Sequence, residues 1–189
     1  MRNISALMLA LVASVAMETA SATPNICPNI GADTNCGFII TVNPNQTLGI
    51  ASTGQGAYDS SDDTLIGIIN NSTGTINSVN LTGNYIFGFE GDGISNSFYN
   101  APGNSQDTTG YGGPDTYFTK ISANFDSGTA NFIGGLAPGQ STYFSLESDL
   151  TQAGTPLGGT VGNTVPEPAT LALLGLGLAG MGYIRRRKN

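Results

Sequence analysis

Short apolar runs separated by polar, turn-forming residues make up the middle of the chain. The run 64–69 is almost entirely apolar and ends at the polar turn 70–74. Val79 and Leu81 follow this turn and alternate with polar neighbours, a period-two pattern that is typical of a strand. The pattern predicts two strands that pair as a hairpin across the turn.

The rest of the body, residues 58–150, has the same character. No segment in it shows helical periodicity over three turns. About seven short strands joined by Gly, Asn and Pro favour a two-sheet sandwich, which buries one face of each sheet. The predicted fold class is therefore all-β, and the further strands are expected at 85–89, 117–125, 130–132 and 142–147, with a weaker one at 38–42.

Two stretches of the body carry a family resemblance. IGIINNSTGTINSVNLTG has an apolar strand that ends at Asn before a Gly turn, and LAPGQSTYFSLE has a Pro-Gly turn that leads into a terminal strand. In these features residues 58–150 resemble bacterial immunoglobulin-like exported domains. The resemblance implies an immunoglobulin-like β-sandwich, although a jelly roll or a small barrel would give a similar alternation.

The first 22 residues have the order of a secretory signal peptide. Arg2 supplies the positive start, 4–16 is mostly apolar, and Ala-Ser-Ala at 20–22 offers the small-x-small pattern that a signal peptidase requires. The alternative is a buried or membrane-anchoring helix, and the apolar stretch is short for a membrane span. We expect a signal helix at 1–22, followed by an N-terminal segment at 23–57.

The chain ends in a three-part tail at residues 165–189, which a flexible linker at 151–164 is expected to join to the body. Pro166, Glu167 and Pro168 come first, and sixteen uncharged residues follow at 169–184. As a helix this uncharged segment would reach about 24 Å, a marginal transmembrane span. Four basic residues then close the tail and should stay on the cytoplasmic side. They are Arg185, Arg186, Arg187 and Lys188.

This tail closely resembles the PEP-CTERM sorting signal of Gram-negative bacteria, some members of which carry the label ice-binding protein C-terminal domain. In that family the signal is recognised by exosortase, a membrane-embedded, cysteine protease-like transpeptidase. The resemblance implies a precursor held in the inner membrane by its C-terminal helix and a processed protein at the cell surface or in the extracellular matrix. Because such signals accompany exopolysaccharide production, it also implies a biofilm role. It says nothing about ice binding by the body.

Charge is distributed unevenly along the chain. Five of the six basic residues lie in the two terminal signals, which leaves Lys120 against eleven acidic residues between Thr23 and Val165. The net charge of this exported part is −10, compared with −7 for the whole chain. Such a surface repels phosphate backbones and anionic lipid headgroups, so we expect no nucleic-acid partner. Cations, neutral sugars and basic partners are compatible with it.

Two cysteines, Cys27 and Cys36, lie nine positions apart in a segment that would fold outside the reducing cytosol. We favour a disulfide over a metal pair or a catalytic thiol. The chain contains no histidine. This absence excludes a Cys–His pair, a zinc site built from Cys and His, and a Ser-His-Asp hydrolase.

Clustered carboxylates are the remaining candidate chemistry. They lie in two turns, at YDSSDD and FEGDG, and supply hard oxygens of the kind that calcium binds, without the spacing of an EF-hand. Such residues are often merely solvated or cap the backbone, and two carboxylates across a cleft could also serve a glycosidase. No catalytic residue and no cofactor other than calcium is expected. The candidate calcium ligands are Asp59, Asp62, Asp63, Glu90 and Asp92.

The long segment 91–115 is rich in Asn, Gly, Ser and Asp and contains Phe98, Tyr99 and Tyr111. It could present stacking rings to a sugar, and the alternative is a disordered insert between two strands. Together with the tail, these features favour a structural or adhesive matrix protein without enzymatic activity. A calcium- or carbohydrate-binding module is the second function class, and a carboxylate-based glycosidase is the third.

Overall fold

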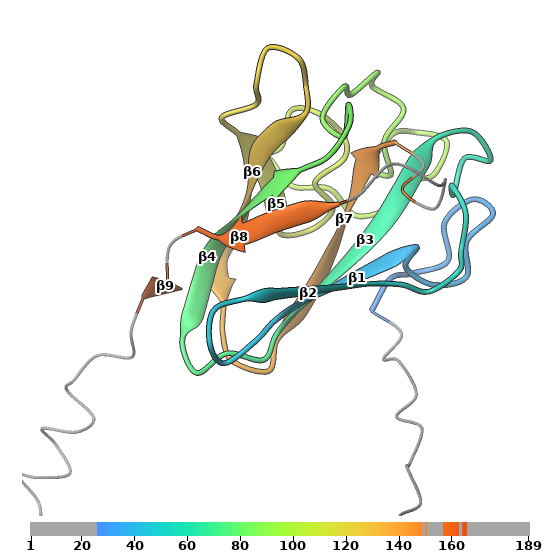
Figure 1. Ribbon diagram of the computed structural model, residues 1–189. Coiled ribbons are helices and arrows are strands. Elements are labelled where there is room, and N and C mark those ends of the chain that lie inside the picture. The colour runs from blue at the N-terminus through green and yellow to red at the C-terminus, as the bar shows by residue number, and fades with distance from the viewer. Residues whose placement is uncertain (1–25, 149, 151–156, 163, 166–189) are drawn as a thin grey trace, which may run out of the picture.

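The computed structural model describes residues 26–148, 150, 157–162, 164 and 165, and Figure 1 shows its strands in two layers. This part of the chain forms nine strands and no helix, so the all-β prediction is confirmed. The strands are β1 (Phe38–Val42), β2 (Leu48–Ser52), β3 (Asp63–Asn70), β4 (Thr75–Thr82), β5 (Thr116–Thr119), β6 (Ser127–Leu136), β7 (Ser141–Glu147), β8 (Gly158–Val161) and β9 (Thr164–Val165).

The strands form two sheets that share one apolar core. One sheet has the order β2-β1-β3-β7, and the other has the order β5-β6-β4-β8, with β9 paired to β4. Side chains of β1, β3 and β7 from one sheet and of β4 and β6 from the other belong to a single buried cluster. The predicted two-sheet architecture is therefore confirmed, whereas the immunoglobulin-like fold stays a prediction. Central members of the cluster are Ile40, Ile66, Val79, Phe132 and Phe144.

The strand β3 is buried on both faces, because a second apolar cluster covers the outer face of its sheet. Leu65 of β3 packs there with residues of the N-terminal segment, among them Cys27 and Cys36, and with Ile94 of the segment 91–115. A strand covered on both faces has no polar face. This explains why the run 64–69 lacks the alternation seen in β4.

The predicted hairpin between the run 64–69 and the strand at 79–81 is wrong. β3 pairs with β1 and β7, whereas β4 pairs with β6, β8 and β9. Both strands send apolar side chains into the shared core, from opposite sides. Two strands in opposite layers of a sandwich cannot hydrogen-bond to each other, so the turn 71–74 carries the chain from one sheet to the other.

The predicted strand at 85–89 is also wrong, since these residues form turns and irregular structure. Tyr85 has a φ of 58°, and its carbonyl oxygen accepts a hydrogen bond from the Gly88 N–H at 3.1 Å. Ile86 and Phe87 are nevertheless fully buried in the shared core. Their burial produces an apolar run that sequence alone cannot distinguish from a strand.

The remaining differences concern short strands. The predicted strand 117–125 is confined to β5, because Lys120 and Phe125 have φ values of 54° and 61° and bend the chain. β2 and β8 were not expected, and β8 lies in the segment 151–164, where the sequence predicted a linker. β2 and β8 are edge strands, and both contain Gly and polar residues. Their apolar pattern in the sequence is therefore weak.

Candidate functional site

The acidic turn before β3 is built around the Asp59 side chain. Its Oδ1 accepts hydrogen bonds from the backbone N–H groups of Ser61, Asp62 and Asp63, at 3.0 to 3.1 Å. An aspartate that binds the backbone a few residues further on is a common turn former. Asp59 therefore shapes the turn that presents Asp62 and begins β3 at Asp63.

Asp63 is a buried carboxyl with only part of its hydrogen-bonding capacity used. Its side chain is 1% exposed, and its Oδ2 accepts a 2.7 Å hydrogen bond from the Tyr58 hydroxyl. Its Oδ1 is buried without any hydrogen-bond partner. The pKa of the Asp63 carboxyl is raised to about 8. Burial is the largest cause, the hydrogen bond from Tyr58 acts in the opposite direction, and the negative charge of Glu147 adds to the increase.

Glu147, the last residue of β7, lies directly opposite Asp63 in the antiparallel register of β3 and β7. It is 3% exposed, and its Oε2 accepts hydrogen bonds from the Tyr111 hydroxyl at 2.5 Å and from the Glu90 N–H at 3.3 Å. Burial raises the pKa of the Glu147 carboxyl, although both hydrogen bonds act in the opposite direction. Like charges placed directly opposite each other destabilise a sheet.

The Tyr111 hydroxyl lies between the carboxylates of Glu147 and Asp92. It lies 2.6 Å from Asp92 Oδ1 as well as 2.5 Å from Glu147 Oε2. Burial and hydrogen bonds to both carboxylates raise the pKa of Tyr111, so the phenol stays protonated. A phenol has one hydrogen to donate, so it can satisfy only one of two ionised acceptors at a time.

Three carboxylates meet at this junction of β3 and β7. Asp62, Asp63 and Glu147 each bring one carboxylate oxygen to within 4.8 Å of the others. Asp62 is exposed, so the group opens to solvent on its side, whereas the other two are buried. We call Asp62, Asp63 and Glu147 the carboxylate cluster.

The five acidic residues singled out from the sequence have different places in the structure. Asp62 and Asp63 belong to the carboxylate cluster, whereas Asp59 caps the turn and Asp92 reaches the cluster through Tyr111. Glu90 is exposed, and its backbone N–H donates a hydrogen bond to Glu147. Glu147 was missed. Its only sequence signal is an acidic residue at the end of an apolar strand, and its proximity to Asp63 depends on strand register.

The segment 91–115 is ordered by its own polar side chains. Asn104 donates hydrogen bonds to the carbonyl oxygens of Gly113 and Thr116, and Asp107 accepts from the N–H groups of Gly110 and Gly112. The interpretation of this segment as a disordered insert is therefore wrong.

The three aromatic residues of that segment have different exposures. Tyr111 is fully buried and cannot present its ring to a sugar. Tyr99 packs edge-on against Tyr58, with ring centroids 5.0 Å apart. Phe98 is 83% exposed, and it is the ring of this segment that is offered most fully to solvent.

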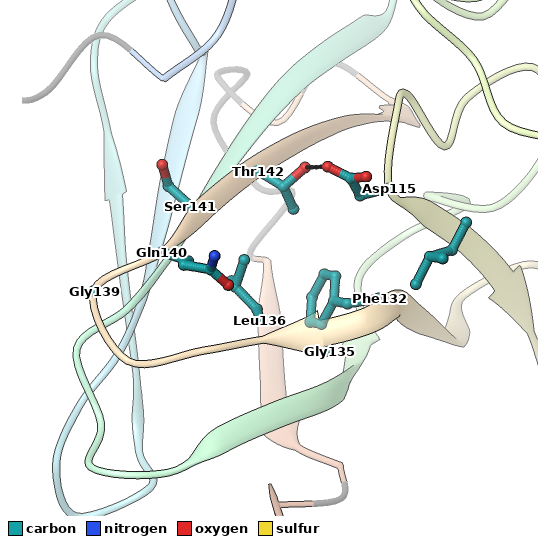
Figure 2. A pocket seen from close by; sticks show the side chains of 9 residues that line it. Asp115, Phe132, Gly135, Leu136, Gly139, Gln140, Ser141 and Thr142 are labelled. Carbon is teal, nitrogen blue, oxygen red and sulfur yellow. Dashed lines mark hydrogen bonds between the residues drawn. The ribbon is translucent and has the colours of Figure 1, made fainter.

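A separate cleft lies where β6 turns into β7, on the route of the chain between the two sheets. It has a volume of about 390 Å³ and is lined by Phe132 and Leu136 of β6 and by Ser141 and Thr142 of β7, among others. Figure 2 shows the Thr142 hydroxyl directed at the Asp115 carboxylate, with the two oxygens 3.4 Å apart. Among the described residues that line this cleft, Asp115 is the one that carries a charge.

The cysteines of the N-terminal segment form a disulfide that packs on the outer face of β3. Cys27 and Cys36 are joined with a Cα–Cα distance of 5.0 Å, and both are buried. Gly67 of β3 gives the sulfur its space, since a Cβ at this position would lie 2.5 Å from Cys36 Sγ. The disulfide therefore closes a loop within the N-terminal segment, and this loop packs against the sheet that carries Asp63.

Comparison with known protein families identifies the C-terminus. The PEP-CTERM protein-sorting motif matches residues 164–188, so the chain carries the sorting tail of an exported protein that an exosortase recognises. No curated protein and no solved structure matches the chain. The match begins in β9, where Thr164 and Val165 pair with Ile76 and Thr75 of β4.

Most of the matched motif lies outside the described residues. This applies to the triplet Pro166-Glu167-Pro168, to the basic residues Arg185–Lys188 and to the predicted transmembrane helix, and also to the predicted signal helix at 1–22. Within the part of the chain that the structure describes, no helix has the length and apolarity needed to cross a membrane.

Proposed function

We infer that this chain is an exported matrix protein, whose tail is processed by an exosortase and whose β-sandwich then acts as a structural or adhesive component at the cell surface or in exopolysaccharide. The observation that carries the proposal is the PEP-CTERM motif at 164–188. A motif of this kind serves export and processing at the inner membrane. The action of the body in a polysaccharide matrix is our interpretation of that destination.

The arrangement of the body supports processing without damage to the fold. The last described strand, β9, ends at Val165, one residue before the Pro-Glu-Pro triplet. Cleavage at or beyond the triplet would therefore leave every described strand in the released body. Two prolines in the triplet also prevent it from continuing the sheet as a regular strand.

The charge and the disulfide of the body support an extracellular role. A net charge of −10 keeps the exported part soluble and repels anionic headgroups. The disulfide suits an oxidising compartment. A calcium- or carbohydrate-binding module is the second candidate. The carboxylate cluster favours its calcium form, and the exposed Phe98 ring favours its carbohydrate form.

Processing is tested by replacing residues of the tail in the native host. Glu167→Ala, or neutral residues at 185–188, should leave unprocessed precursor in the membrane fraction. Thr170→Ala, in the same tail, and Lys120→Gln, a basic residue outside it, are the controls and should be processed normally. Mass spectrometry of the mature wild-type protein is decisive, because an intact C-terminus at Asn189 in a host with an exosortase would refute the proposal.

The matrix role needs a separate measurement. Processed protein recovered from the host should co-sediment with the exopolysaccharide of that host, and Phe98→Ala should reduce the bound fraction if ring stacking contributes. Phe125→Ala, at another partly exposed ring, is the matched control. A wild-type protein that stays in the supernatant would leave sorting intact and would refute the adhesive role.

A further inference from the structure

We propose that Asp62, Asp63 and Glu147 form a calcium site at the junction of β3 and β7. Their carboxylate oxygens lie within 4.8 Å of one another, a separation that a single ion can bridge. The register of the sheet places Asp63 directly opposite Glu147, so the fold itself brings these two buried carboxylates together. The proposal concerns the body alone and stands independently of how the tail is sorted.

The second observation is the free oxygen of Asp63. This residue is 1% exposed, its Oδ2 is occupied by the Tyr58 hydroxyl, and its Oδ1 is buried without a hydrogen-bond partner. An unpartnered buried acceptor destabilises the folded state, and does so more strongly when it is charged. Native proteins rarely keep such an atom without a reason. A cation bound in the carboxylate cluster would supply the partner that Oδ1 lacks.

The charges around the cluster point the same way. The charged groups that act on Asp63 are Glu147, Asp59 and Asp92, and those that act on Glu147 are Asp62 and Asp92. All of them are acidic. Lys120 is the only basic residue between Thr23 and Val165, so this part of the chain cannot surround the cluster with cationic side chains. Buried carboxylates without such partners are neutralised by protons or by a metal ion.

The donor set selects a hard cation. Every candidate ligand is a carboxylate oxygen, the chain has no histidine, and both cysteines are in the disulfide. Softer metals such as zinc prefer nitrogen and sulfur ligands. Calcium takes about six to eight oxygens in flexible geometry, which three carboxylates and water entering beside the exposed Asp62 can provide. Magnesium demands a more regular octahedron and gives up its water reluctantly.

Neighbouring residues hold the ligands in position. Asp59 Oδ1 fixes the turn that carries Asp62, and the Tyr111 hydroxyl, itself bonded to Asp92, orients Glu147 Oε2. In this proposal Asp59 and Asp92 position the ligands and do not themselves bind the ion, in contrast to the ligand role that the sequence predicted for them.

The test uses the exported, processed protein after treatment with a chelator. Terbium replaces calcium in oxygen sites and emits when a nearby aromatic ring transfers energy to it. The chain has no tryptophan, and the hydroxyls of Tyr58 and Tyr111 touch Asp63 and Glu147. Tyrosine-sensitised terbium emission should therefore appear with one ion per chain and should be displaced by calcium. Calcium should also raise the melting temperature.

Variants separate a specific site from general screening. Asp62→Asn, at an exposed position that should not affect folding, should weaken calcium binding at least about tenfold. Asp63→Asn and Glu147→Gln should do the same where circular dichroism shows them folded. Asp115→Asn removes the same charge from an exposed residue at the β6–β7 cleft and should bind as the wild type does.

Three results would overturn the proposal. The first is that no terbium emission appears, or that calcium does not displace it. The second is that Asp115→Asn loses as much calcium affinity as Asp62→Asn. The third is that sodium chloride at matched ionic strength raises the melting temperature as much as calcium does. Each would mean that protons or diffuse counterions neutralise the carboxylate cluster.

Discussion

The Tyr111 hydroxyl lies 2.5 Å from Oε2 of Glu147, and both residues are buried. Tyr111 belongs to the long segment 91–115, whereas Glu147 ends β7. The contact therefore ties a segment without regular strands to the sheet that carries the carboxylate cluster. The Tyr111 carbonyl oxygen strengthens this link by accepting a 2.8 Å hydrogen bond from the Ser145 N–H.

Removing this hydroxyl should destabilise the body. We expect Tyr111→Phe to lower the free energy of unfolding by about 1–3 kcal/mol, because the buried Glu147 carboxylate loses the hydrogen bond from the Tyr111 hydroxyl. Tyr117→Phe is the control. Tyr117 is half-buried, and its phenol makes no hydrogen bond to any residue that the structure describes, so its change should stay within about 0.5 kcal/mol. Urea unfolding in chelator measures both, and equal effects of the two variants would contradict the assigned role of Tyr111.

The space beside the disulfide gives a second prediction. Gly67→Ala should lower the free energy of unfolding by about 1–3 kcal/mol, because the added Cβ would lie 2.5 Å from Cys36 Sγ in a packed layer. Gly56→Ala is the matched control, since a Cβ there meets nothing within 4 Å. Thermal unfolding under oxidising conditions compares the two variants.

The same substitution in a protein without the disulfide tests whether Cys36 Sγ is the atom that the added Cβ would approach too closely. In a protein with Cys27→Ala and Cys36→Ala, the sulfur is absent, so Gly67→Ala should cost less than in the wild type. An unchanged cost would show that the strain arises elsewhere along β3, and the close approach of the disulfide would not explain the glycine.

Part of the fold could be predicted because local patterns decide it. β1 and β7 follow from short apolar or alternating runs, and β3 follows from a continuous apolar run between turn formers. Sequence could not show that the outer face of β3 is covered by a disulfide segment and by Ile94, because that contact joins distant parts of the chain. It also could not assign β3 and β4 to different sheets.

The carboxylate cluster shows the same limit. Asp59, Asp62 and Asp63 were predicted together because they share one turn, and Glu90 and Asp92 were added because they share a second acidic turn. Glu147 lies 84 positions after Asp63 and joins it only through the register of β3 and β7. Tertiary pairing, not local composition, thus determines which acidic residues converge.

Asn70 holds together the two crossings between the sheets. Its Nδ2 donates hydrogen bonds to the Gly74 carbonyl oxygen at 2.8 Å and to the Leu136 carbonyl oxygen at 2.7 Å. Its Oδ1 accepts from the Ser72 N–H at 2.9 Å. The turn 71–74 leads from β3 to β4, and Leu136 ends β6 just before the chain returns to β7. One buried amide therefore satisfies backbone groups of both connections.

We expect Asn70→Ala to lower the free energy of unfolding by about 2–4 kcal/mol, because three buried backbone groups lose their hydrogen bond to the Asn70 amide at once. Asn70→Asp should cost more, since it keeps the acceptor for Ser72 but turns a carboxylate oxygen toward two carbonyl oxygens. Asn84→Ala, at an exposed asparagine, should change stability by less than about 0.5 kcal/mol. Chemical denaturation of the three variants measures the order. If Asn70→Asp proved as stable as the wild type, the amide could not be what fastens the two crossings, and backbone pairing alone would have to hold this end of the sandwich closed.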